Sequence, residues 1–153
     1  KLVNDISSSE YLVKYHGVEA SPAPYFNLEE EHQLHKCIAE MIAERTVNAA
    51  HDCADGGLFV TLVEMGMNGN YGCSISTSSE IRKDAFLFGE SQGRVVVSLK
   101  KDNVDSLKSI CQNHQVPFYH LGQVRENDEM VIDNEQFDNI EDYKNHSESV
   151  INP

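Results

Sequence analysis

The stretch AHDCADGGLFVTLVEM, residues 50–65, runs from a short extended segment through two glycines into an apolar helix. The segment TVNAAHDC before the glycines predicts a short buried strand, and GGLFVTLVEMGMNG predicts a helix that Gly69 ends. Glycines between a strand and a helix leave backbone N–H groups open to an anion. The stretch therefore predicts an α/β arrangement and a first candidate site.

The segments on either side of this stretch also alternate between helix and strand. Upstream, Asn27 with Glu30 three residues later predicts a capped helix whose core-facing stripe runs to about Arg45. The segment VRENDEMVID resembles a hairpin and so indicates a mixed sheet. We expect further strands in YGCSIS, RVVVSL, PFYHLGQV and EMVID, and further helices in SSEIRKDAFLFGE, in the Asp-capped DNVDSLKSICQNH and in the acidic tail 134–146. The predicted fold class is an α/β (α+β) sandwich, a mixed β-sheet flanked by helices.

The length and composition fit one globular domain over residues 1–153. Within it we expect a linker with a short serine-capped helix in 1–26, a core in 27–132 and a C-terminal helix or tail in 133–153. No apolar run approaches the roughly 20 residues of a membrane span, and Lys1 opens a polar stretch instead of an apolar leader. Since the chain lacks an initiator Met, we expect a piece of a longer cytoplasmic protein.

The net charge limits the classes of binding partner, and the cysteines indicate the redox compartment. A net charge of -13 argues against nucleic acid and anionic membranes as partners. The four cysteines are widely spaced without a CxxC pair, which favours reduced thiols in the cytosol.

The residues before the two glycines include several potential metal ligands. In an extended strand His51 and Cys53 point to one face and Asp52 to the other, so a zinc site is disfavoured. Asp52 is instead a candidate magnesium ligand beside a bound phosphate.

The glycines themselves favour an anion site. Gly56 and Gly57 precede a helix N-terminus, where bare N–H groups receive a phosphate. An ordinary tight turn in which Asp55 caps the helix is about as good an interpretation.

A second candidate site is FGESQGR, residues 88–94, between a predicted helix and the clearest predicted strand. Its polar run comprises Glu90, Ser91 and Gln92, and Arg94 could hold an anion or pair with Glu90. A solvent-facing turn is the alternative. The pair His32 and His35 on one helix face is interpreted as surface.

The blocks SSEYL, AHDCADGGLFVTLVEM and LFGESQGRVVVSL, in this order, resemble the synthetase portion of the phosphoribosylformylglycinamidine synthase family. The resemblance runs from about Ser8 to about Ile132. It is to the C-terminal type of domain shared with aminoimidazole ribonucleotide (AIR) synthetase. It implies the last domain of the second of two tandem halves in that portion.

The family resemblance implies an activity for the parent enzyme. That enzyme uses ATP and magnesium to phosphorylate the amide oxygen of formylglycinamide ribonucleotide, and ammonia from a glutaminase subunit or domain then displaces the phosphate. The family's catalytic histidine and ATP-binding residues lie mainly in its N-terminal-type domains. The isolated chain is therefore expected to be inactive, and an apolar interface left bare would make it sticky or dimeric.

The resemblance also implies binding positions, in a half whose cleft looks auxiliary. A segment and a loop that help to bind magnesium and substrate in the family's first half match this chain, and His51 stands where that half has glutamine. The implied phosphate- and substrate-binding positions are His51, Asp55, Gly56, Gly57, Glu90, Ser91, Gln92 and Arg94, with Asp52 for magnesium.

Two alternatives stay open at this stage. One is another member of the same superfamily, a thiamine-phosphate kinase or hydrogenase maturation protein, against which FGESQGR argues. The other is a stand-alone ligand-binding module, which a gene with its own start codon here would favour.

Overall fold

A computed structural model describes residues 4–151, so the expectations for residues 1–3 and 152–153 lie outside the described part. Helices and strands alternate along most of the chain, as predicted. The helical elements are η1 (Tyr11–Tyr15, a π-helical turn), α1 (Leu28–Ala43), α2 (Gly57–Met67), α3 (Lys83–Phe88), η2 (Lys101–Asn103, a 3-10 turn), α4 (Val104–Asn113) and α5 (Ile140–Ile151). The strands are β1 (Ala49–Asp52), β2 (Gly72–Ile75), β3 (Val95–Ser98), β4 (Gly122–Arg125), β5 (Met130–Ile132) and β6 (Glu135–Gln136).

Within the described residues the strands form two sheets. β1 and β3 make an antiparallel ribbon, and the second sheet has the order β4-β2-β5-β6. In this second sheet β2 runs parallel to β5 and antiparallel to β4, while β5 and β6 are antiparallel. The prediction of a mixed sheet is confirmed.

The predicted hairpin in VRENDEMVID is wrong, because β4 and β5 lie on opposite sides of β2. Cys73 of β2 faces Val124 on one side and Met130 on the other. The turn between β4 and β5 therefore crosses the end of β2, where Gly72 N donates to Asn127 O at 2.6 Å. A Cβ on Gly72 would lie 2.0 Å from Glu129 O, so glycine is what lets this turn approach the strand.

Two predicted strands differ from the structure. The strand in TVNAAHDC forms as β1, but Ala49, Ala50 and Asp52 are exposed rather than buried. The strand expected in PFYHLGQV begins only at Gly122. Pro117 has no N–H to donate to a ladder, and residues 116–121 run as an irregular segment.

The helices follow the predictions with shifted ends. Asn27 caps α1 as predicted, since its side chain accepts from the N–H groups of Glu29 and Glu30. α2 ends at Met67 rather than at Gly69, and α3 begins after Arg82, beyond the serines expected to cap it. Asp102 lies in η2 and does not cap the helix that follows. The tail helix starts only at residue 140, after the short β6.

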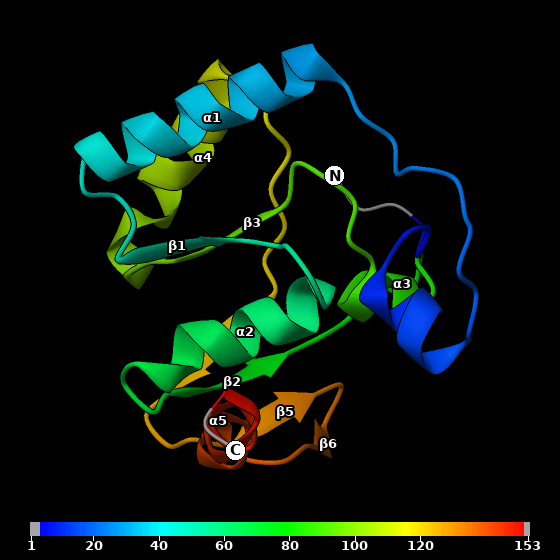
Figure 1. Cartoon of the computed structure of the whole chain (residues 1–153). Helices are drawn as coiled ribbons and strands as arrows, with labels where there is room; N and C mark the ends of the chain where they lie inside the picture. Colours follow the sequence, from blue (N-terminus) through cyan, green and yellow to red (C-terminus); the bar gives the residue numbers. More distant parts are fainter. Residues whose placement is uncertain (1–3, 152–153) are drawn as a thin grey trace.

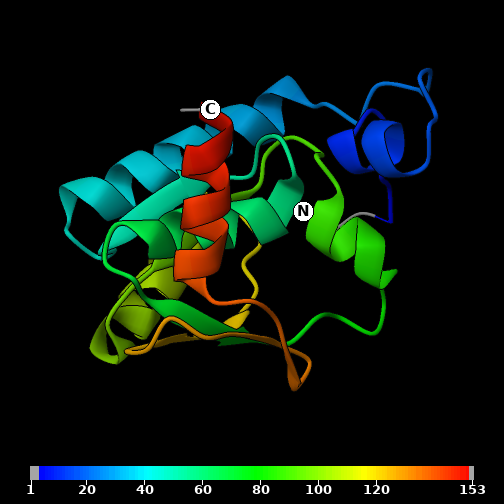
Figure 2. The same ribbon diagram turned by 60° about the horizontal axis from the view of Figure 1, so that its bottom comes forward.

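The apolar helix α2 lies at the centre of the layers (Figure 1). The α1–α4 pair covers one face of the β1–β3 ribbon, and α2 lies against the other face and against β2 (Figure 1). In the turned view of Figure 2, α5 lies beside α2. Ile140 at the start of α5 is 1% exposed and belongs to the core. The main core combines Leu58, Val63, Cys73, Ile75, Phe86, Leu87, Val96, Met130, Ile132 and Ile140. The sandwich predicted from the sequence is confirmed.

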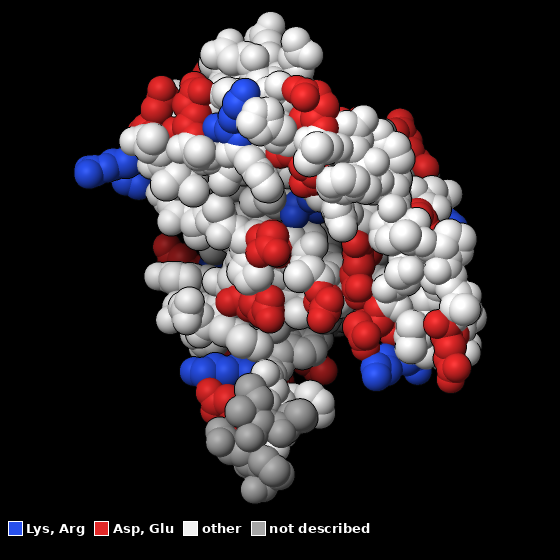
Figure 3. All heavy atoms as spheres, turned by 45° about the horizontal axis from the view of Figure 1, so that its top comes forward, with Lys and Arg blue, Asp and Glu red and all other residues white. Residues whose placement is uncertain are grey.

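The surface agrees with the acidic composition. On the face that carries α1, acidic side chains outnumber basic ones (Figure 3). Among residues 4–151, no helix combines the length and the apolar character that crossing a bilayer requires.

Candidate functional site

One carboxylate oxygen joins the three sequence blocks that carry the family resemblance. Oε1 of Glu90, from FGESQGR, accepts the backbone N–H of Gly56 at 2.8 Å and the backbone N–H of Glu10 at 2.8 Å. Gly56 belongs to the glycine turn before α2, and Glu10 belongs to SSEYL. The three blocks, distant in sequence, therefore meet at Glu90, and an internal anion already holds the N–H group at the start of α2.

The glycine turn is shaped mainly by packing. Gly56 takes the N-cap position of α2 with φ 80°, and Asp55 is exposed, so the alternative in which Asp55 caps the helix is wrong. Gly57 has φ 65°, and a Cβ there would lie 2.7 Å from Gly89 O and 2.9 Å from Leu87 O. Glycine is required at this position because α2 begins against the backbone that follows α3.

Among the described residues Arg94 does not pair with Glu90, which was one of the two alternatives that the sequence left open, and its terminal nitrogens bond to backbone carbonyl oxygens instead. Its Nη1 donates to Gly89 O at 2.7 Å and its Nη2 donates to Phe86 O at 2.9 Å. Both oxygens lie at the C-terminal end of α3, where free carbonyls carry partial negative charge. Burial lowers the pKa of the Arg94 guanidinium from its usual value. Arg94 therefore acts as a C-terminal cap that shapes the loop bearing Glu90.

The thiol of Cys53, beside Arg94, is half-buried. Burial raises the pKa of Cys53, and the positive charge of Arg94 opposes this shift in part. A thiol kept neutral in this way is a poor nucleophile.

The other two polar residues of FGESQGR point to different environments. Ser91 is 6% exposed, and its Oγ has no hydrogen-bond partner in the described part of the chain. Gln92 is exposed. Among the described residues of the run Glu90–Gln92, only Glu90 makes a side-chain hydrogen bond to the glycine turn.

His51 and Asp52 lie apart from Glu90, in a hollow of about 350 Å³ between α1 and the β1–β3 ribbon. The hollow is lined by Ile38, Ile42, Ala50, His51, Asp52 and Val95. The His51 ring contacts Asp52 O through Nδ1 at 2.7 Å and lies 3.3 Å from Glu64 Oε2 through Nε2. The predicted site residues are thus divided between this hollow and the turn at Gly56.

The described residues do not form a metal-binding cluster. Within residues 4–151, no three side chains of His, Cys, Asp or Glu are grouped as ligands of one ion. Mg²⁺ is commonly bound through one or two carboxylates, with phosphate oxygens and water as its other ligands, so the assignment of Asp52 to magnesium beside a phosphate stays a prediction. His32 and His35 are exposed, as predicted.

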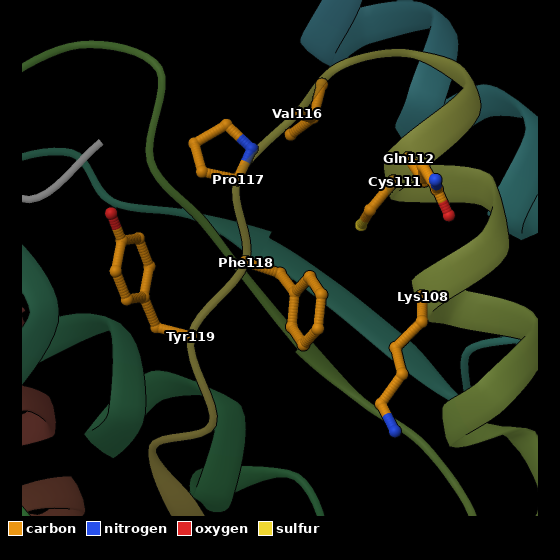
Figure 4. Close-up of a pocket in the computed structure, with 7 residues that line it drawn as sticks. All are labelled: Lys108, Cys111, Gln112, Val116, Pro117, Phe118 and Tyr119. Atoms are coloured by element: carbon orange, nitrogen blue, oxygen red, sulfur yellow. The ribbon is translucent and has the colours of Figure 1, made fainter.

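A second hollow, of about 430 Å³, lies between α4 and the irregular segment before β4. Its lining residues are Lys108, Cys111, Gln112, Val116, Pro117, Phe118 and Tyr119 (Figure 4). The Phe118 ring points toward α4, and the Tyr119 ring points to the opposite side of the segment (Figure 4). None of the predicted site residues lines this hollow.

Sequence reasoning missed two residues at the meeting point. Glu10 contributes a backbone N–H, which a side-chain motif does not reveal. Phe88 stacks on Tyr11 with ring centroids 4.7 Å apart, so its ring packs against the N-terminal segment. The sequence held one indication of this contact, because Tyr11 and Phe88 lie in two of the three blocks that carry the family resemblance.

Comparisons with known proteins agree with this arrangement. The chain matches the family described as AIR synthase related protein, C-terminal domain, over residues 3–133. It is 36% identical over 129 residues to the phosphoribosylformylglycinamidine synthase subunit PurL of Caldanaerobacter subterraneus, covering 84% of this chain and 18% of that protein. PurL of Symbiobacterium thermophilum is 39% identical over 125 residues, covering 79% and 16%. The chain thus spans less than a fifth of the length of these curated relatives.

Solved structures show the same fold. Thermotoga maritima PurL complexed with FGAR superposes with a TM-score of 0.69 at 20% identity, covering 82% of this chain and 23% of that chain. The structure of PurLQS from Thermotoga maritima gives a TM-score of 0.69 at 18% identity, covering 88% and 24%. With the family match over most of its length, this chain belongs to the family of AIR synthase related proteins, as a C-terminal domain.

Proposed function

We propose that this chain is the C-terminal-type domain of the second tandem half of a phosphoribosylformylglycinamidine synthase. The whole enzyme would convert formylglycinamide ribonucleotide to formylglycinamidine ribonucleotide with ATP, magnesium and ammonia from a glutaminase. The observation that carries the proposal is the meeting of all three family-like blocks at the Glu90 carboxylate. The curated relatives bearing this enzyme's name support it.

The proposed role of the domain is to build and pack the enzyme, without catalysing the reaction by itself. Its partners would be the other synthetase domains and the glutaminase, in the cytoplasm. The exposed side chains of Tyr25, Phe26 and Leu28, at the start of α1, offer apolar surface for such packing. Left bare, the same surface would favour dimers of the isolated chain.

The proposed phosphate cradle at Asp55, Gly56 and Gly57 is degenerate. The Glu90 carboxylate holds the Gly56 N–H, and a phosphate oxygen there would meet a like charge. His51 and Asp52 contribute to binding only together with groups from another domain, because their hollow is open and holds no metal cluster among the described residues.

A domain exchange tests the proposal. The segment of Caldanaerobacter subterraneus PurL that matches this chain over 129 residues is replaced by the matching part of this chain. Conversion of formylglycinamide ribonucleotide is then measured with ATP and ammonia. We expect the chimera to retain activity and the isolated 153-residue chain to show none. A chimera that folds and yet has no activity would count against the assignment, with unmodified PurL as the positive control.

A titration tests whether the cradle is degenerate. Calorimetry of the isolated chain with Mg-ATP, Mg-ADP and formylglycinamide ribonucleotide is expected to give no binding heat. Saturable binding to the unaltered chain would show that the cradle still works.

A further inference from the structure

Residues 4–26, here called the N-terminal arm, are held against α3 and the loop after it. Asn4 Oδ1 accepts the N–H of Arg82 at 3.1 Å. The arm and the loop come closest where a Cβ on Gly89 would lie 2.7 Å from the carbonyl oxygen of Asp5. These contacts bring the start of the arm alongside α3, which Figure 1 shows next to the blue N-terminal segment.

The middle of the arm, at η1, is held by one aromatic stack and one charged contact. Tyr11 stacks on Phe88 at 4.7 Å with the ring planes 13° apart. Immediately before it, Glu10 N donates to Glu90 Oε1. The turn itself is a poor anchor, because a single π-helical turn of five residues has little stability of its own.

Oxygen Oε1 of Glu90 is shared between the arm and the core. A carboxylate oxygen has two lone pairs. Here one lone pair accepts the backbone N–H of Glu10 in the arm, and the other accepts the backbone N–H of Gly56 in the core. Both are charge-assisted bonds of 2.8 Å, which are stronger than bonds between neutral groups. The link therefore depends on the negative charge of a single side chain.

We propose that Glu90 is a latch whose carboxylate fastens the N-terminal arm to the start of α2. When the latch is lost, the arm opens at η1 while the core stays folded. Opening separates Tyr11 from Phe88 and so bares an aromatic cluster in which Phe88 also packs on Phe59 at 5.6 Å. The latch goes beyond the proposed function and does not depend on it.

Cleavage by trypsin in the native chain tests the latch. Lys14 lies in η1 and Lys36 in α1, so cleavage after Lys14 reports opening of the arm and cleavage after Lys36 reports unfolding of the core. In Glu90→Ala we expect cleavage after Lys14 to become roughly tenfold faster or more, as expected for loss of a hydrogen bond to a charged group. Cleavage after Lys36 should remain far slower than cleavage after Lys14, because the core keeps its packing although Gly56 loses its acceptor.

Two further variants complete the test. Gln92→Ala, an exposed neighbour in the same loop, should cleave like the unaltered chain. Glu90→Gln keeps the shape of the side chain and one acceptor oxygen but removes the charge. Its cleavage after Lys14 should therefore be faster than in the unaltered chain and slower than in Glu90→Ala. This variant also keeps the test decisive if the alanine variant does not fold. Cleavage after Lys14 that is no faster than cleavage after Lys36, or no acceleration at Lys14, in the folded Glu90 variants would overturn the latch. Since no nucleotide is used, this outcome is independent of the domain exchange.

Discussion

Arg94 donates to the carbonyl oxygen of Gly89 at 2.7 Å, a bond that turns an apparent ligand-binding arginine into a structural cap. A second bond, to Phe86 O, fixes the planar guanidinium in place. The loop that carries Glu90 therefore has its geometry set by a half-buried cation whose two terminal nitrogens bond to backbone carbonyl oxygens.

Arg94→Lys should destabilise the chain by about 2–4 kcal/mol, since an ammonium group cannot reach both carbonyl oxygens in the planar arrangement of a guanidinium. The matched control is Arg82→Lys, at an exposed arginine that pairs with Asp84, for which we expect a change below about 1 kcal/mol. Urea unfolding measures both. Equal effects of the two substitutions would contradict the capping role.

Gly57→Ala should destabilise the chain far more than Gly17→Ala. Both glycines have positive φ, 65° and 68°, so both substitutions carry the left-handed penalty of about 1–2 kcal/mol. Gly17 has no heavy atom within 4 Å of a built Cβ in the described structure, whereas Gly57 would clash with the backbone at Gly89. The difference in melting temperature between the two variants measures the cost of the clash at Gly57. Similar melting temperatures would argue against close packing there.

Ser91→Ala should be neutral or should stabilise the chain by up to about 1 kcal/mol. The Ser91 hydroxyl is buried without a partner among the described residues, and removing such a group relieves its desolvation penalty. Chemical denaturation checks the sign. A loss of stability would indicate a hydrogen bond that the structure does not contain, and Thr61→Val, at a hydroxyl that donates to Gly57 O at 3.0 Å, is the destabilising reference.

The stability of the chain should fall as the pH rises above about 9, through Cys37. Burial raises the pKa of Cys37 from 9.0 to about 12, with Cys111 adding to the shift. The unfolded chain therefore releases this proton first, so the contribution of Cys37 to stability is constant below about pH 9 and declines toward about pH 12.

Urea unfolding of the unaltered chain and of Cys37→Ala, at pH values on either side of 9, measures this contribution. Cys37→Ala begins less stable, because the 0% exposed side chain leaves a cavity, but its alkaline decline should be shallower. Parallel declines in the two proteins would refute the assignment to Cys37.

Local signals in the sequence predicted much of the fold. Asn27 caps α1 because a short polar side chain before an apolar stripe satisfies the first N–H groups of the helix. The run RVVVSL forms β3 because its β-branched residues suit a pleated strand. The mixed sheet also followed from strand and turn patterns, although through a hairpin that does not form.

Long-range contacts were not predictable in the same way. Nothing near Glu90 in sequence shows that its carboxylate reaches Gly56 and Glu10, because such a bond depends on how α2, α3 and the arm pack. Arg94 was misread for a related reason. A lone arginine beside a polar loop suits an anion, and only the folded C-terminal end of α3 shows that two backbone carbonyls take its donors.

The placement of β2 between β4 and β5 has a consequence for synthesis on the ribosome. β2 ends at Ile75, but its two neighbours begin only at Gly122 and Met130. The strand emerges without a partner on either side and stays unpaired while the following helices are made, so non-local pairing must wait for loop closure. Completion of this sheet is therefore a late event, and a nascent chain stopped before residue 130 would present open strand edges to chaperones and to aggregation.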